Sequence, residues 1–179
     1  IFAARSTDGG DTWVYPDATD KTIADGDAGQ GAAACCDPTL AWDSFGNLYV
    51  TYLADLVAGA SPSVETLLST DGGQTFTNIG SFTGGSMDQP TIVAQNTTAA
   101  GAPVAVWVVW NQGGTMRARG AAVTGLGTVG AFNALQTIPG TNGCSFGDIA
   151  IAPSGVVVQT CQTNTGANTG SANIRINID

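Results

Sequence analysis

The chain has 179 residues, which suits one domain of ordinary size or a piece of a larger one. Hydrophobic residues make up 43% of it and charged residues only 11%, which excludes a typical disordered chain. Five Lys and Arg against fourteen Asp and Glu give a net charge of −9, so we expect neither nucleic-acid binding nor attachment to an anionic membrane.

The first predicted element is a strand at residues 1–5, followed by a turn and a second strand that starts near residues 11–15. The turn reads STDGGDTW at residues 6–13, and a near copy, STDGGQTF, occurs at 69–76. Glycine tolerates positive φ in tight turns, and an Asp side chain accepts hydrogen bonds from turn N–H groups. Every residue of the phrase thus has a structural role, and we interpret both copies as turns that hold the fold.

An acidic loop is predicted to follow the first turn. Within it, Asp25-Gly26-Asp27 is similar to part of a calcium loop, because hard cations bind several oxygens. The segment lacks the next Asp/Asn–Gly and the final Glu of an EF-hand. We therefore expect a simple acidic loop first and a Ca²⁺ site at Asp25 and Asp27 second, with no other cofactor.

Strands are predicted throughout the rest of the chain, since no window shows sustained helical periodicity. A complete unit of four strands is expected in residues 35–84. Its strands are predicted at Thr39–Trp42, Leu48–Leu53, Val64–Leu68 and Phe76–Ile79. The opening hairpin of this unit is led by Asp37 and recurs loosely behind Asp88 and Asp148.

This recurrence divides the chain into the end of one unit plus the acidic loop (1–34), two full units (35–84 and 85–142) and a partial unit (143–179). A four-stranded sheet repeating at such a spacing is typical of a propeller blade. The predicted fold is therefore all-β: one β-propeller domain of four-stranded antiparallel blades, incomplete in this segment. Since rings close with about four to eight blades, we expect the remaining blades from the same longer chain or from other subunits.

The leading aspartates, Asp37, Asp88 and Asp148, should lie near the channel of such a propeller. Because they recur in every unit, we interpret them as satisfying backbone groups rather than as a catalytic pair.

Four cysteines predict disulfides and hence an extracellular or cell-surface location, with free buried thiols as the alternative. The last hairpin places Cys161 opposite about Gly147, which leaves Cys144 only slightly out of register. The first expected pairing is therefore Cys144–Cys161 with Cys35–Cys36. The alternative links Cys35 or Cys36 to the last unit.

The pattern S-x-D-x-G-x-T-[WF] resembles the Asp-box, or BNR repeat, of the sialidase-like β-propellers. It is carried by Ser6, Asp8, Gly10, Trp13, Ser69, Asp71, Gly73 and Phe76. The resemblance implies that these residues are structural and that the two aromatic side chains pack between neighbouring sheets. Asp-boxes occur in sialidases, other glycosidases, sorting receptors and non-enzymatic propellers, so the resemblance implies a fold and not an activity.

A sialidase would also need three arginines, a Tyr nucleophile activated by Glu, and an Asp as acid/base. No Arg-Ile-Pro phrase precedes the first box, and the single glutamate, Glu65, lies on a predicted third strand with no Tyr assigned to it. The absence of histidine removes Ser-His-Asp and Cys-His nucleophile arrangements. We carry over no catalytic residue.

These observations favour a secreted or cell-surface propeller module without catalysis, used for surface assembly or for recognition of a glycan or protein. The alternative is a segment of an exo-sialidase or other glycoside hydrolase whose catalytic residues lie partly outside this sequence. No membrane insertion is expected, because no apolar run reaches roughly 18 residues.

Overall fold

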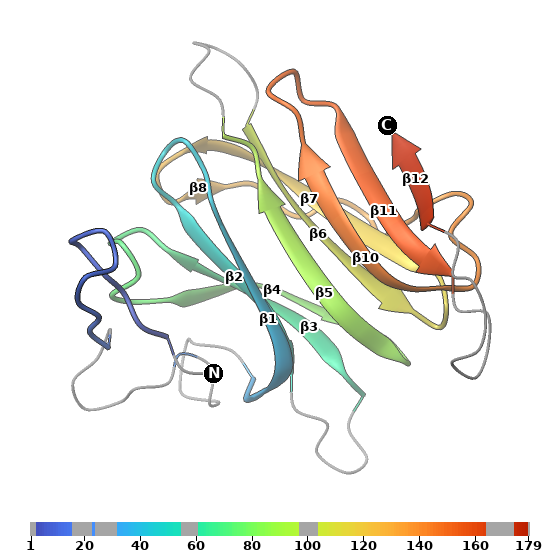
Figure 1. Ribbon diagram of the computed structural model, residues 1–179, viewed down its shortest axis with the longest axis horizontal. Helices are drawn as coiled ribbons and strands as arrows, with labels where there is room; N and C mark the ends of the chain where they lie inside the picture. The colour runs from blue at the N-terminus through green and yellow to red at the C-terminus, as the bar shows by residue number, and fades with distance from the viewer. Residues whose placement is uncertain are drawn as a thin grey trace.

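The computed structural model describes residues 3–15, 23, 32–54, 61–96, 104–163 and 174–178, and its regular elements there are all β-strands (Figure 1). Twelve strands in these residues form three antiparallel sheets. The all-β prediction is therefore confirmed. No helix that could cross a membrane occurs in the described ranges.

The first sheet has the strand order β1-β2-β3-β4. Its strands are β1 (Ala34–Trp42), β2 (Leu48–Ala54), β3 (Ser63–Ser69) and β4 (Thr77–Thr83). They overlap the four strands predicted for this part of the chain. β1 begins at Ala34, five residues before the predicted start at Thr39. A register shift lies between Cys36 and Thr39, and pairing with β2 continues on its N-terminal side.

The second and third sheets repeat this order. The second runs β5-β6-β7-β8 with β9 on β7, and the third runs β10-β11-β12. The strands are β5 (Met87–Ala94), β6 (Val104–Gln112), β7 (Met116–Gly125), β8 (Thr128–Val129), β9 (Gln136–Thr137), β10 (Cys144–Ile151), β11 (Val157–Thr163) and β12 (Ile174–Ile178). Two short strands, β8 and β9, thus pair with β7 where β4 pairs with β3 in the first sheet.

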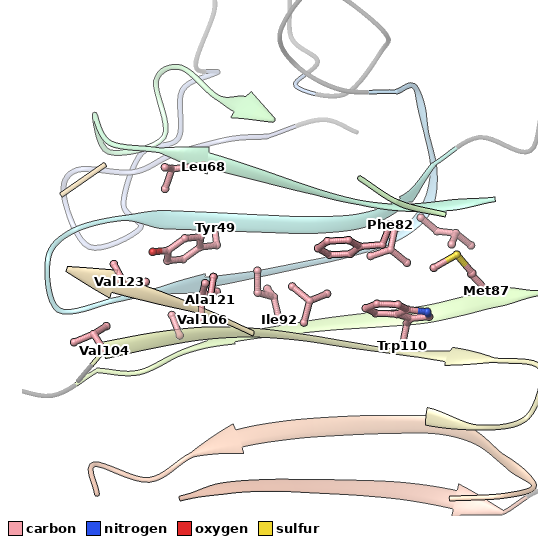
Figure 2. Packing of buried hydrophobic residues seen from close by; sticks show 14 residues of the cluster. Tyr49, Leu68, Phe82, Met87, Ile92, Val104, Val106, Trp110, Ala121 and Val123 are labelled. Carbon is pink, nitrogen blue, oxygen red and sulfur yellow. The ribbon is translucent and has the colours of Figure 1, made fainter. Parts of the chain in front are cut away.

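The three sheets stack face to face, with the second between the other two (Figure 2). Their first strands adjoin, since β5 contacts both β1 and β10. The main core lies between the first and second sheets, where the Phe82 and Trp110 rings stack with centroids 5.4 Å apart and Phe132 meets Phe82 edge-on at 5.1 Å. Such aromatic pairs add about 0.5–1.5 kcal/mol each to the burial of apolar area.

β2 shows how the stack determines burial. All seven of its residues are buried, although one face of a strand usually meets solvent. Tyr49 and Leu53 pack toward the second sheet, whereas Val50 and Tyr52 belong to a smaller cluster on the other face, where Ala3 of the N-terminal segment joins them.

The N-terminal segment forms a hairpin closed by one antiparallel bridge. Arg5 and Val14 exchange two backbone hydrogen bonds of 2.8 and 2.9 Å around the first STDGG turn. The two strands predicted here are thus reduced to a single bridge in the described residues.

Candidate functional site: the groove between the repeated turns

A groove lies between the N-terminal hairpin and the outer face of the first sheet, and encloses about 620 Å³. Both copies of the repeated phrase line it: Gly9 and Gly10 on one side, Gly72 and Gly73 on the other. A Cβ atom added to Gly72 would lie 3.9 Å from the Arg5 guanidinium, so Arg5 reaches from the first turn to the second.

The first turn is held by its own side chains. The Ser6 hydroxyl donates to Asp8 Oδ1 (2.6 Å) and accepts from the Gly10 N–H (2.8 Å). The Thr12 N–H donates to Asp8 Oδ1 (3.0 Å), and its hydroxyl donates to Oδ2. Positive φ at Gly9 and Gly10 makes this closure sterically permissible.

The second turn repeats the same bonds between β3 and β4. The Ser69 hydroxyl donates to Asp71 Oδ1 (2.8 Å) and accepts from the Gly73 N–H (2.9 Å). The Thr75 N–H and hydroxyl donate to the two oxygens of Asp71 (2.9 and 2.6 Å), and the Gln74 N–H adds a further bond of 2.9 Å. Both carboxylates are thus occupied inside their turns, as the structural interpretation requires. Thr12 and Thr75 also hold the turns through these bonds. The sequence marks them because both copies of the repeated phrase have Thr at the same position.

These hydrogen bonds favour the ionised carboxylate. Hydrogen bonds from Ser6 and Thr12 hold the pKa of Asp8 well below its usual range. Partial burial works to raise the pKa of Asp71, but hydrogen bonds from Thr75, Ser69 and Gln74 outweigh it and lower that pKa to about 2.

Asp71→Asn is expected to lower the free energy of unfolding by about 1–2 kcal/mol at neutral pH, because hydrogen bonds to a charged acceptor are lost. The contribution of Asp71 is present above the unfolded-state pKa of about 3.9 and is lost as pH falls through the folded pKa. Urea unfolding at pH 7 and near pH 2 should therefore show the two proteins converge in acid. The exposed Asp11 provides the control Asp11→Asn, for which a change below about 0.5 kcal/mol is expected. A difference independent of pH would contradict the ionic role.

The two aromatic residues of the repeated phrase behave differently. Phe76 is half-buried against the cluster on the outer face of the first sheet. Trp13 was expected to pack between sheets, but its side chain is 64% exposed. Its indole N–H donates to the Gly10 carbonyl at 3.0 Å, which fixes the ring at the groove. The expectation fails for Trp13 because no described sheet lies over it.

The far wall of the groove is also apolar and open. Leu40 and Trp42 of β1 line it and are exposed. Among the described residues that line the groove, Arg5 is the only charged one and none carries a carboxylate. A second groove, lined by Trp107, Ile149 and nine other described residues, also has no carboxylate.

The three leading aspartates do not occupy one repeated position. Asp148 lies three residues before the last pair of its hairpin, Ile151–Val157. The residues at the same distance from the last pair in the first two sheets are Thr39, before Trp42–Leu48, and Thr91, before Ala94–Val106. Asp37 and Asp88 lie further upstream, beside register shifts in β1 and β5. The Asp88 and Asp148 carboxylates each accept the next residue's N–H, at 3.0 and 2.8 Å. Asp88 and Asp148 thus bond to backbone, as expected of the three aspartates, but the three do not share one position in their hairpins.

A buried carboxylate that sequence reasoning missed lies in the β1–β2 turn. Asp43 accepts from the N–H groups of Phe45 (2.9 Å) and Asn47 (3.0 Å), from the Asn47 side chain (2.8 Å) and from the Tyr49 hydroxyl (2.8 Å). Burial and this bond raise the pKa of Tyr49 above its usual range. The role of Asp43 is to close the β1–β2 turn over the core.

Asn47 extends the contact to the second sheet. Its side chain donates to the Gly125 carbonyl (3.1 Å) and accepts from the Gly127 N–H (2.7 Å). Asn47 has no exposed surface. Asp43 and Asn47 thus clamp the first sheet to the β7–β8 turn.

The structure places one Tyr–Glu pair that the sequence did not reveal. Tyr52 lies directly opposite Glu65 in the β2–β3 ladder. Both are buried, however, and the Tyr52 hydroxyl donates to the Ala32 carbonyl at 2.7 Å. Glu65 accepts from Ser63, Asn78 and Ser81. This pair stabilises the sheet and lines neither groove.

The cysteines pair as Cys144–Cys161, with Cα atoms 5.8 Å apart, and Cys35–Cys36. This is the first of the two expected pairings, and Cys161 does lie opposite Gly147. The proposed Ca²⁺ ligands Asp25 and Asp27 lie outside the described residues. Elsewhere in the described part of the chain, no group of three or more acidic or cysteine side chains is arranged to hold a metal ion.

The chain matches no protein-family model and no curated protein.

Proposed function

We propose that this chain supplies blades of an Asp-box β-propeller and serves outside the cell as a recognition and assembly module without catalysis. The fold part is supported by three antiparallel sheets that follow in sequence order, stack face to face and bring β1, β5 and β10 together. The turn from Ser69 to Phe76 joins the third and fourth strands of its sheet, where an Asp-box belongs. Two disulfides fit an oxidising compartment.

The observation that carries the functional part is the main groove. Its described lining residues combine Trp13, Trp42 and Arg5 and include no carboxylate. Glycoside hydrolysis requires two carboxyl groups on either side of the scissile bond, or a Tyr nucleophile with its Glu. Three of the described carboxylates, those of Asp8, Asp71 and Asp43, are instead bonded within turns. Exposed aromatic rings beside a single cation suit binding to a partner surface.

Incubation of the purified full-length protein with a fluorogenic sialoside tests this proposal. We expect no release of fluorophore above the uncatalysed rate, with an active sialidase as positive control. Parallel binding to a glycan array, without turnover, would identify recognition of sugars. Turnover by the full-length protein would replace the proposal with the alternative, a glycoside hydrolase of which this chain is a segment.

A further inference from the structure

The outer face of the third sheet is open and apolar. Ile174, Ile176 and Ile178 of β12 alternate along one face and are 63–71% exposed. Ile176 pairs with Thr160, which pairs with Asp148, so all of these residues share that face. Figure 1 places β12 and the N-terminal segment at opposite ends of the stack. One end of the stack is therefore an uncovered hydrophobic surface.

In the first two sheets, the equivalent face is buried against the next sheet. Thr39 accepts the Ile92 N–H at 3.1 Å across the first boundary, and the Thr91 hydroxyl donates to the Gly147 carbonyl at 3.4 Å across the second. Asp148 occupies the same hairpin position in the third sheet as Thr39 and Thr91 do in theirs. The third sheet therefore exposes the same kind of face that the first and second sheets each bury against the next sheet.

The other end of the stack presents the complementary face. Ile92 and Ile149, which follow Thr91 and Asp148, are 5% and 7% exposed because the preceding sheet covers them. Leu40 follows Thr39 in the same way but is 65% exposed. Trp42, two positions on, shares its face and is also exposed. The first sheet therefore has the receiving surface without a sheet upon it among the described residues.

Charge favours joining these two ends. The third-sheet face carries the exposed carboxylate of Asp148, and the described residues that line the groove on the first sheet include Arg5 and no carboxylate. Two third-sheet faces would instead bring two copies of Asp148 together, and like charges at an interface are unfavourable.

We propose that a second copy of this chain docks head to tail on the first. The third-sheet face of one copy, formed by Phe146, Asp148, Ile174, Ile176 and Ile178, covers the groove of the next around Leu40 and Trp42. The Asp148 carboxylate of one copy then meets the Leu40 N–H of the next, as Thr39 meets Ile92. Such a heterologous interface closes into a ring or continues as a filament. This inference rests on the proposed assembly role and names its partner and its site.

Sedimentation equilibrium of the purified chain and two variants tests the docking. Ile176→Asp disables one face and Trp42→Asp the other, and both positions are exposed, so folding should persist and is checked by thermal unfolding. The wild type is expected to associate, and each variant alone is expected to lose association at least about tenfold. An equimolar mixture of the two variants should form a dimer, since each retains the face that the other lacks. Leu135→Asp, at an exposed apolar residue outside both faces, should associate like the wild type.

Several outcomes would overturn the inference. These are a wild type that stays monomeric at about 1 mM, association of Trp42→Asp alone, or a mixture that remains monomeric. A monomer that does not hydrolyse the sialoside would refute the docking and leave the proposed function standing. Hydrolysis would refute the proposed function whatever the mass.

Discussion

Asp43→Ala is expected to lower the free energy of unfolding by about 3 kcal/mol or more. The substitution leaves the Tyr49 hydroxyl, the Asn47 amide and two turn N–H groups without their acceptor in a buried turn. Each buried donor left unsatisfied costs about 1–3 kcal/mol, offset in part by water that enters the turn. Urea unfolding followed by tryptophan fluorescence, to which the buried Trp110 contributes, measures the change.

A matched control lies in the same turn. Ser44 is exposed next to Asp43, so Ser44→Ala should change stability by less than about 0.5 kcal/mol. Tyr49→Phe removes the hydroxyl that donates to Asp43 and leaves no unsatisfied donor behind, so it should lower the free energy of unfolding by about 1 kcal/mol. A loss below 1 kcal/mol for Asp43→Ala would mean that the clamp is replaceable by water.

The clamp also joins two sheets, which makes a second measurement informative. Asn47 bonds both Asp43 and the β7–β8 turn at Gly125 and Gly127. Residues in one hydrogen-bond network do not contribute additively. The double variant Asp43→Ala, Asn47→Ala should therefore destabilise the protein by less than the sum of the single variants.

Much of the fold was predictable because its signals are local. Strand composition, turn glycines and the repeated phrase predicted the four strands of the first sheet. They also predicted the turn between its third and fourth strands, at residues 69–76. Hairpin counting placed Cys161 opposite Gly147, which the β10–β11 register confirms. Each of these depends on residues close together in the sequence.

What the sequence did not reveal depends on distant contacts and on small irregularities. The partners of Asn47 in the second sheet lie 78 and 80 residues away, and no local pattern marks them. The equivalence expected of Asp37, Asp88 and Asp148 failed because they stand five, six and three residues before the last pair of their hairpins. Register shifts in β1 and β5 also change the pairing beside the first two. Spacing along the chain cannot show a bulge, since a bulge changes pairing without changing composition.

Removal of the buried disulfide by Cys144→Ala with Cys161→Ala is expected to lower the free energy of unfolding by about 3 kcal/mol. The crosslink joins residues 17 apart in sequence, and closing a loop of this size removes about that much conformational entropy from the unfolded chain. Both sulfur-bearing residues are also buried, next to Met116. Urea unfolding without reductant, with the disulfide content checked by intact mass, measures the loss.

The vicinal pair provides the matched control for this effect. Cys35 and Cys36 are adjacent, so their crosslink closes almost no loop, and Cys35→Ala with Cys36→Ala should cost less than about 1 kcal/mol. The two disulfides should also differ in how readily a reductant reaches them, because Cys35 is exposed whereas Cys144 has no exposed surface. Under mild reductant the folded chain should first gain two hydrogens, at Cys35–Cys36, and the second pair should follow only as the sheet opens. Equal losses from both double variants would show that loop closure is not the cause, and that local packing at the strand ends sets the stability instead.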